Sequence, residues 1–262
     1  MIPHKLSKGQ IYYHHDDSHK SHPPHAHNDG PGSYMKKSGT REIKVVRRVL
    51  DVNEKMANQN RRIFTEKGVY VVNVMSSPGS GKTTTLEKTL VKLMPEIKCA
   101  VIVGDICTTN DADRLAVSGA PVVQVNTDEF GGDCHLAAHV IEHAMSAIDL
   151  DGIDLLIVEN VGNLVCPAEF DIGEDTRVVV LSVTEGEDKP AKYPLMFRVC
   201  DAAILNKIDL LPYLEDYDKQ KAVDYIHQVH PNMPIFELSA KSEEGLEPWI
   251  EWLKGKVREK KA

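Results

Sequence analysis

The 262-residue chain predicts an α/β fold, a doubly wound and mostly parallel sheet covered by helices on both faces. Two observations carry this prediction. Short, continuous apolar runs, typical of strands buried on both faces, alternate with longer segments whose apolar residues recur every three or four positions. Apolar residues make up 42% of the chain and charged residues 27%, the balance of a globular domain. We expect one domain over residues 41–262.

The elements follow in order along the chain. A first helix at residues 42–64 is indicated by Val45, Val49, Val52 and Met56, which recur at helical spacing. Apolar runs then predict strands at residues 69–75, 99–103, 121–125, 154–158, 178–183, 202–205 and 235–238. Helical spacing predicts the remaining helices at residues 81–94, 111–117, 134–148, 219–230 and 245–257.

Residues 1–40 have a different composition. They hold seven of the chain's 12 histidines, four prolines and four glycines, with hardly any aliphatic side chains. Because such a stretch cannot bury enough apolar surface to offset ordering, we expect a disordered, His-rich tail. Its imidazoles would bind Ni²⁺ or Zn²⁺ loosely, in competition with protons near about pH 6–7. A metal reservoir is therefore one interpretation, and an inert linker or an expression tag is the alternative.

Charge and cysteine usage exclude several classes of protein. The net charge is −8, and because residues 1–40 carry +2, residues 41–262 carry −10, a poor match for the phosphates of nucleic acid. No apolar run reaches the roughly 18 residues of a membrane helix, and the N-terminus lacks a secretory signal. The cysteines are odd in number and form no C-x-x-C, which argues against a disulfide framework: Cys99, Cys107, Cys134, Cys166 and Cys200. We expect a cytoplasmic protein that binds neither nucleic acid nor membrane.

A phosphate-binding loop joins the strand at residues 69–75 to the helix at residues 81–94. Residues 76–83 read Ser-Ser-Pro-Gly-Ser-Gly-Lys-Thr, which matches G-x-x-x-x-G-K-[ST] except that Ser76 replaces the first glycine. The glycines let backbone amides curl around phosphate at a helix N-terminus. Lys82 is expected to reach the β- and γ-phosphates, and the Thr83 hydroxyl to bind Mg²⁺. The sequence therefore predicts a P-loop NTPase whose phosphates bind at Gly79, Ser80, Gly81, Lys82 and Thr83.

Two further motifs indicate that the base is guanine. Asn206, Lys207 and Asp209 form an N-K-x-D after the strand at residues 202–205. Ser239, Ala240 and Lys241 form an S-A-K after the strand at residues 235–238. They resemble, in order and context, the guanine-recognition motifs of GTPases. A carboxylate at Asp209 can accept hydrogen bonds from both guanine N1–H and the 2-amino group, a pattern that adenine lacks. We expect GTP and GDP as the nucleotides.

Carboxylates for Mg²⁺ are expected where two strands end. Asp105 ends the strand at residues 99–103, and Glu159 opens an E-x-x-G whose glycine is Gly162, where Ras-like GTPases have D-x-x-G. Glu159 would hold Mg²⁺ through water, and the Gly162 amide would sense the γ-phosphate. Lys82 and Asp105 are the residues expected to act in catalysis. Because Asn163 rather than glutamine follows Gly162, we expect slow intrinsic hydrolysis that association activates.

Cys134, His135 and Cys166 are candidate ligands for Ni²⁺ or Zn²⁺. Adjacent residues of a helix do not face the same way, so Cys134 and His135 would share one ion only at a distorted helix start, or would serve two ions at a subunit interface. A rival set is His135, His139 and His143, spaced along one helical stripe.

Residues 67–254 resemble the HypB family, the nickel-incorporating GTPases of [NiFe]-hydrogenase maturation. The resemblance is carried by residues 77–84, 104–105, 110–112, 134–136, 159–167 and 206–209, among them Cys-His-Leu and Glu-Asn-Val-Gly-Asn-Leu-Val-Cys-Pro. It implies a SIMIBI-like GTPase, a phosphate loop extended to Thr84, and a metal site at Cys134, His135 and Cys166. It also implies GTP-dependent homodimers across that site. The chain departs from the family at Ala137, where an aspartate is frequent, and it lacks the cysteine-rich N-terminal motif of some members.

The predicted function is that of a GTP-hydrolysing nickel metallochaperone in hydrogenase maturation. By the resemblance, its partners would be other nickel chaperones of that process and the precursor of the hydrogenase large subunit. Two alternatives remain open: a nickel-storage protein with a regulatory nucleotide domain, and a urease-type nickel-insertion GTPase.

Overall fold

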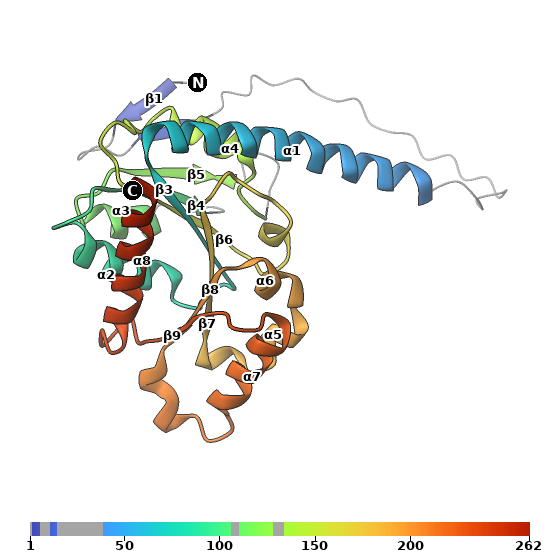
Figure 1. Ribbon diagram of the computed structural model, residues 1–262, viewed down its shortest axis with the longest axis vertical. Coiled ribbons are helices and arrows are strands. Elements are labelled where there is room, and N and C mark those ends of the chain that lie inside the picture. Colours follow the sequence, from blue (N-terminus) through green and yellow to red (C-terminus); the bar gives the residue numbers. More distant parts are fainter. Residues whose placement is uncertain (1, 6–10, 15–38, 106–109, 128–133) are drawn as a thin grey trace, which may run out of the picture.

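The computed structural model describes residues 2–5, 11–14, 39–105, 110–127 and 134–262 (Figure 1). Seven strands form one parallel sheet in the order β5-β4-β6-β3-β7-β8-β9. Their bounds are β3 Tyr70–Ser76, β4 Cys99–Asp105, β5 Val122–Asn126, β6 Leu155–Gly162, β7 Thr176–Ser182, β8 Ala202–Asn206 and β9 Ile235–Glu237. This confirms the predicted doubly wound, mostly parallel α/β fold.

Two short strands, β1 (Ile2–Lys5) and β2 (Ile11–His14), pair antiparallel, and β2 lies parallel to β5 at the sheet edge. The rest of residues 1–38 lies outside the described residues. The predicted disorder of residues 1–40, and the domain boundary drawn there, stay predictions.

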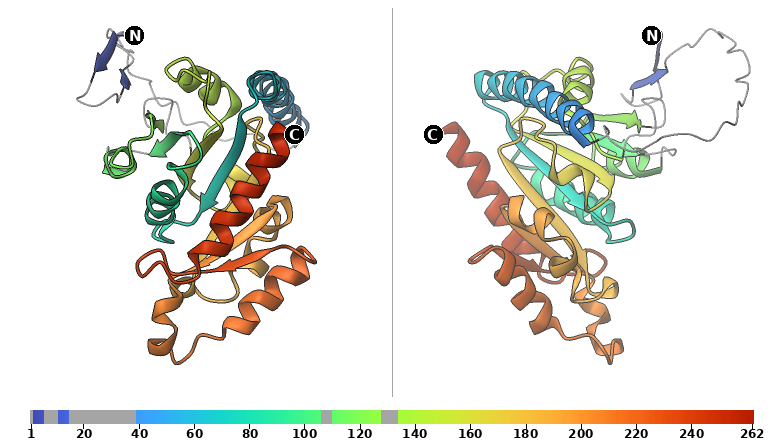
Figure 2. Two further views of the ribbon diagram at one scale, coloured as in Figure 1. Left: turned by 60° about the vertical axis from the view of Figure 1, so that its left-hand side comes forward. Right: turned by 90° about the vertical axis from the view of Figure 1, so that its right-hand side faces the viewer.

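The helices cover both faces of the sheet, and the alternation of side chains along β3 assigns the faces. Tyr70, Val72 and Val74 belong to a core that includes residues of α2, α3 and α8, whereas Val69 and Val71 belong to one with residues of α1 and α4. The latter face continues beneath α6 and α7. Figure 2 shows α1 and α4 side by side in both views. Helix bounds are α1 Gly39–Lys67, α2 Lys82–Leu93, α3 Asn110–Ala116, α4 Ala138–Met145, α5 Lys189–Lys192, α6 Pro194–Val199, α7 Lys219–Val229 and α8 Leu246–Lys261.

The predicted helix at residues 134–148 is wrong at its start. Helix α4 begins at Ala138, so Cys134 and His135 precede it on irregular backbone. The residue that caps α4, Ala137, offers no side-chain hydrogen bond, so the sequence holds no capping signal at the true start.

Parallel strands bring their carboxyl ends to one edge of the sheet, and ligands of open α/β sheets bind outside that edge. The loops after β3, β4, β6, β8 and β9 all leave the sheet there. All five predicted nucleotide motifs lie in these loops or at these strand ends. Among the described residues, no helix combines the length and apolar character needed to cross a membrane.

Candidate nucleotide and metal site

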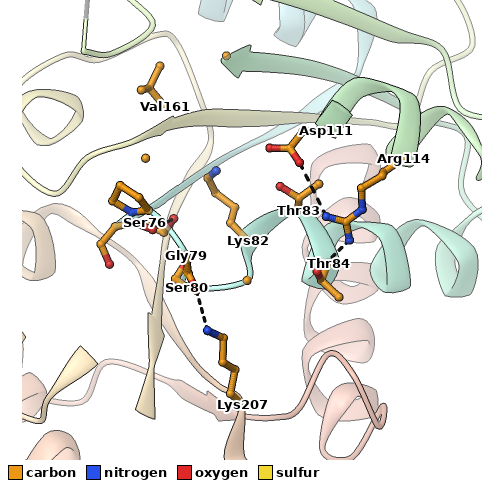
Figure 3. Close-up of a pocket in the computed structure, with 15 residues that line it drawn as sticks. Ser76, Gly79, Ser80, Lys82, Thr83, Thr84, Asp111, Arg114, Val161 and Lys207 are labelled. Atoms are coloured by element: carbon orange, nitrogen blue, oxygen red, sulfur yellow. Dashed lines mark hydrogen bonds and ion pairs between the residues drawn. The ribbon is translucent and has the colours of Figure 1, made fainter. Parts of the chain in front are cut away.

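A cavity of about 560 Å³ lies at the phosphate loop, which connects β3 to α2 (Figure 3). Its lining consists of residues 76–84 together with Gly104, Asp111, Arg114, Val161, Gly162 and Lys207. The hydroxyl oxygens of Ser77 and Ser80 are buried there without a hydrogen-bond partner among the described residues. Buried, unpaired hydroxyls beside a helix N-terminus suit an anion with several acceptor oxygens.

Gly81 is required by the shape of this loop. Its backbone is left-handed, with φ +90°, and a Cβ there would lie 2.4 Å from Nδ2 of Asn206. Gly79 is also left-handed, at φ +78°, but with open space around it. Both glycines of the loop therefore provide a left-handed backbone, and Gly81 in addition allows the close approach of Asn206.

Lys82 and Thr83 line the cavity, and both contact Glu159. One carboxylate oxygen of Glu159, Oε1, accepts hydrogen bonds from Lys82 Nζ at 2.8 Å and from the Thr83 hydroxyl at 2.6 Å. Glu159 is only 1% exposed, and its other oxygen, Oε2, has no hydrogen-bond partner among the described residues. Water therefore does not take the place of the missing partner on an open surface. A buried carboxylate oxygen and a threonine hydroxyl are the hard oxygen ligands that Mg²⁺ prefers, so these residues fit the ion.

The other expected phosphate contacts reach the same edge. Asp105 is the last residue of β4, whose Val103 pairs with Glu159 of β6, but its side chain lies outside the described residues. Gly162 lines the cavity, and a Cβ there would lie 3.2 Å from the Cα and N atoms of Pro78. The end of β6 at Gly162 therefore packs closely against Pro78 of the phosphate loop.

Asn206 joins the two base motifs to the phosphate loop. Its amide nitrogen Nδ2 donates to the Ser80 carbonyl oxygen at 2.9 Å, and its Oδ1 accepts from the Ala240 amide at 3.0 Å. Lys207, left-handed at φ +64°, donates from Nζ to the Gly79 carbonyl at 2.7 Å. Thus N-K-x-D and S-A-K meet as their order in the chain predicts.

The remaining base residues lie outside the lining of the cavity. Asp209 stands in the first turn of the 3₁₀ helix Ile208–Tyr213 and is half-buried. Ser239 is fully buried, and Lys241 is exposed. Their roles in base recognition stay predictions.

Cys134, His135 and Cys166 come together from two loops. Their ligand atoms lie within 4.8 Å of one another, the one such group of three metal-ligating side chains found among the described residues. Cys134 and His135 precede α4, and Cys166 opens a short 3₁₀ helix, Cys166–Ala168, after β6. Because the backbone at residues 134–135 is not helical, both neighbours can approach one point. His135 does not belong to α4, so the rival set of His135, His139 and His143 does not form a helical stripe.

The structure pairs Cys134 and Cys166 as a disulfide, with Cα atoms 6.2 Å apart. The odd cysteine count argued against a disulfide framework, and this one pairing corrects that argument for Cys134 and Cys166, because a cysteine count carries no information about which loops meet at the sheet edge. The ring of His135 packs at a tilt of 31° against the ring of Phe170, with centroids 3.8 Å apart. Cys99 and Cys200 are buried and form no disulfide. Burial raises the pKa of the Cys99 thiol to about 12 and also raises the pKa of the Cys200 thiol, so neither forms the thiolate that binds metal. Cys107 lies outside the described residues.

Arg114 and Asp111 of α3 also line the cavity, and sequence reasoning gave neither an individual role (Figure 3). Arg114 Nη2 donates to the Thr84 hydroxyl and to Glu87 Oε2, both at 2.9 Å. Thr84 is therefore held by Arg114 at the rim of the cavity. The residues occur on a short helix of mixed polarity, and only the packing of α3 against α2 places them at the site.

Comparisons with known proteins agree with this geometry. Residues 70–237 match the family model for the CobW/HypB/UreG nucleotide-binding domain. The hydrogenase maturation factor HypB of Escherichia coli K12 is 45% identical over 253 residues, covering 97% of this chain and 82% of that protein. The crystal structure of HypB from Archaeoglobus fulgidus is 37% identical with a TM-score of 0.73, covering 79% of this chain and 99% of that one. The structure of HypB from Helicobacter pylori in complex with nickel is 40% identical with a TM-score of 0.73, covering 79% and 95%.

The predicted resemblance is thereby confirmed over most of the chain. A phosphate loop, a guanine-type N-K-x-D tied to it by Asn206, and a cluster of two cysteines and a histidine all lie at one edge of a parallel sheet. The chain belongs to the HypB family of hydrogenase maturation factors, within the CobW/HypB/UreG group of nucleotide-binding domains.

Proposed function

We propose that this protein is a GTP-hydrolysing nickel metallochaperone, which binds Ni²⁺ as its cargo at Cys134, His135 and Cys166 and releases it according to the state of the nucleotide. The observation that carries the proposal is the short path between the two sites. Gly162 lines the phosphate cavity, and Cys166, four residues further along the same loop, belongs to the metal cluster. A relative described as a complex with nickel supports nickel as the metal.

The proposed chemistry at the nucleotide follows from Lys82, Thr83 and the carboxylates at the ends of β4 and β6. Lys82 donates to Glu159 through one proton of its ammonium group, so two protons are left to donate to phosphate oxygens. Thr83, Glu159 and Asp105 would hold Mg²⁺, which when bound neutralises charge on the β- and γ-phosphates. Lys82 and Asp105 would act in hydrolysis, and the Gly162 amide would report whether the γ-phosphate is present. With Asn163 following Gly162, intrinsic hydrolysis would be slow and raised by GTP-dependent dimerisation.

The metal site would respond through that loop. Three ligands leave the fourth position of a four-coordinate Ni²⁺ or Zn²⁺ ion for water or for a second subunit, which fits a homodimer across the site. A shift of the Gly162 loop between GTP and GDP would move Cys166 and change the affinity for the metal. Nickel would then pass to another maturation chaperone or to the precursor of the hydrogenase large subunit.

The test is a titration of the protein with Ni²⁺, and separately with Zn²⁺, in saturating GDP and in a non-hydrolysable GTP analogue. We expect the affinity at the cysteine site to differ between the two nucleotides. Cys166→Ala should remove that difference while GTP still binds. A nucleotide dependence that survives unchanged in Cys166→Ala would contradict the proposal.

A storage role for the His-rich stretch is the alternative from another class, and seven histidines within 27 residues favour considering it. Deletion of residues 1–40 separates the two. A chaperone retains nucleotide-dependent nickel binding, whereas a storage protein loses most of its nickel capacity and its function together. A urease-type insertion GTPase is disfavoured by the Cys-His-Leu and Val-Cys-Pro pattern.

A further inference from the structure

We propose that Asn160 is a positioning residue that links the nucleotide site to the loop carrying Cys134 and His135. The inference rests on the proposed nucleotide-dependent metal binding and adds a second route to it. Asn160 follows Glu159 directly on β6, and its side chain is completely buried. Asn160 belongs neither to the lining of the cavity nor to the three metal-ligating side chains, and it would act through the backbone of Leu136.

The hydrogen bonds of Asn160 define the link. Its Oδ1 accepts from the backbone amide of Leu136 at 3.1 Å, and Leu136 is the residue after His135. The same oxygen accepts from the Val161 amide at 2.9 Å. The residue that holds the loop carrying Cys134 and His135 is therefore the immediate neighbour of Glu159, the proposed Mg²⁺ ligand. A displacement of β6 at Glu159 moves the atom that holds Leu136.

The side-chain amide of Asn160 has no freedom to turn away. Its Nδ2 donates to Oδ1 of Asn73 at 3.1 Å, and Asn73 lies on β3, three residues before the phosphate loop begins at Ser76. Asn73 in turn donates to the buried carboxylate of Glu174 at 3.2 Å. Nδ2 of the Asn160 amide is thus held by Asn73 of β3, and Oδ1 is held by the Leu136 backbone amide. Because the amide group cannot rotate without breaking these bonds, it should pass a shift of β6 on to Leu136.

Leu136 also contacts the strand that carries the other proposed Mg²⁺ ligand. A Cβ at Gly104 would lie 2.8–3.0 Å from three side-chain atoms of Leu136, so the leucine packs directly on the glycine that precedes Asp105. Leu136 is fully buried. The residue next to His135 is therefore held between the ends of β4 and β6, the two strands expected to respond to the γ-phosphate.

The two routes reach different ligands. The covalent path from Gly162 leads to Cys166, whereas the hydrogen bond of Asn160 leads to Cys134 and His135. Asn163 adds a contact of its own, with Nδ2 donating to the Cys134 carbonyl at 3.4 Å. The nucleotide would therefore reposition both halves of the metal site relative to each other.

Asn160→Ala tests the inference, with Asn60→Ala as the matched control. Asn60 is an equally buried asparagine that holds the same segment, donating to the carbonyls of Ala138 and Ile172 at 2.8 and 3.1 Å, but it lies on α1 and not on a nucleotide strand. Full-length protein is titrated with Ni²⁺ in saturating GDP and in saturating non-hydrolysable GTP analogue. The near-ultraviolet thiolate-to-nickel charge-transfer band is followed, because histidines do not contribute to it.

Coupling between two sites typically changes affinity by about 5- to 150-fold, so the wild-type ratio between nucleotides is measurable. Because the route through Cys166 remains in Asn160→Ala, we expect that ratio to fall to about half of the wild-type value or less in this variant and to remain at the wild-type value in Asn60→Ala. A wild-type ratio in Asn160→Ala, or an equal loss in Asn60→Ala, would overturn the role of Asn160. If the wild type binds nickel with the same affinity in GDP and in the GTP analogue, the proposed function itself fails, and not only the link through Asn160.

Hydrogen exchange in the unaltered protein tests the same link without metal and without a variant. The Leu136 amide is held by Asn160, whereas the nearby Ala138 amide is held by Asn53 of α1 at 2.9 Å. We expect the exchange rate of the Leu136 amide to differ between GDP and the GTP analogue, and that of Ala138 to stay the same. Equal rates for Leu136 in the two nucleotides would rule out transmission through Asn160.

Discussion

The side-chain amide of Asn206 donates a hydrogen bond to the carbonyl oxygen of Ser80 across 126 residues of sequence, at 2.9 Å. Through this bond the loop after β8 that carries the N-K-x-D motif is joined to the phosphate loop after β3. The missing side chain of Gly81 leaves the space that Asn206 occupies. Recognition of the base and of the phosphates should therefore fail together when this contact is disturbed.

Gly81→Ala should weaken guanine-nucleotide binding by at least about tenfold, equivalent to about 1.4 kcal/mol. The added Cβ would lie 2.4 Å from Asn206 Nδ2, on a residue whose φ of +90° already disfavours side chains. Titration with a fluorescent GDP derivative measures the affinity. Gly119→Ala is the control, because Gly119 has φ +88° but open space around it. Equal affinities for wild type and Gly81→Ala would show that the contact is dispensable.

Asp209→Asn should shift the preference from guanine to xanthine nucleotides. In the predicted site the carboxylate would accept hydrogen bonds from two donors of guanine, whereas xanthine replaces the 2-amino group by a carbonyl, to which the asparagine amide could donate. Sites built on such hydrogen bonds discriminate by up to about 10⁴–10⁵. Competition between GTP and XTP for the wild type and the variant measures the shift. An unchanged preference would place base recognition elsewhere than the N-K-x-D motif.

Glu159→Gln should slow GTP hydrolysis by about 100-fold, the order seen when one electrostatic contact to a transition state is removed. Glutamine can still accept the hydrogen bonds of Lys82 and Thr83, but the uncharged group holds Mg²⁺ poorly. Single-turnover rates over a range of Mg²⁺ concentrations provide the measurement. The Mg²⁺ concentration for half-maximal rate should rise in the variant, and the same Mg²⁺ dependence as wild type would argue against Glu159 as a ligand.

Nickel binding at the cysteine site should require a reducing agent. Cysteine binds metal as thiolate, and the Cys134–Cys166 disulfide offers none. Protein treated with diamide should lose the thiolate-to-nickel absorption band, and a reducing phosphine should restore it. Cys134→Ala cannot form this disulfide, so its remaining nickel absorption should not respond to diamide. A band of full intensity in the oxidised wild type would remove the two cysteines from the ligand set.

Asp154 predicts a loss of stability in acid. Burial raises the pKa of this carboxyl, but hydrogen bonds from Lys261 and from the Lys98 amide outweigh it, and the net pKa lies below the ordinary 3.8. A carboxylate with a lowered pKa stabilises the fold above its unfolded pKa, and this contribution disappears as the pH falls through the folded value. Asp154→Asn should lower the Tm at pH 6, by at most about 2–4 °C, and the gap from wild type should narrow as the pH falls below the ordinary carboxyl pKa of 3.8. Thermal unfolding across that range measures it, and a gap independent of pH would contradict the assignment.

The strands could be predicted from the sequence because apolar runs of a parallel sheet are buried on both faces and need no partner to be recognised. Strand β6 extends four residues past its predicted end at 158, through Glu159 and Asn160, which are polar yet at most 1% exposed. Polarity argued for a loop there, and tertiary hydrogen bonds decided otherwise. Helices α5 and α6 were missed because each is shorter than two turns and has a proline in its first turn.

The residues of the site also include some that the sequence pattern reveals and some that it does not. Residues of the phosphate loop, such as Gly79, Gly81 and Lys82, could be found from their spacing alone. Arg114 and Asn160 could not, because their importance depends on which segments the fold brings beside them. Cys134 and Cys166 lie 32 residues apart, and only the common edge of the sheet makes them neighbours.

The hydrogen bond between Asn160 and Leu136 has a consequence in the opposite direction. Linkage between two binding equilibria is reciprocal: if GTP changes the affinity for nickel by some factor, nickel changes the affinity for GTP by the same factor. The concentration of free nickel would then set which nucleotide the protein holds at a given ratio of GTP to GDP. Coupling of this kind would make the protein a sensor of the nickel that it is proposed to carry.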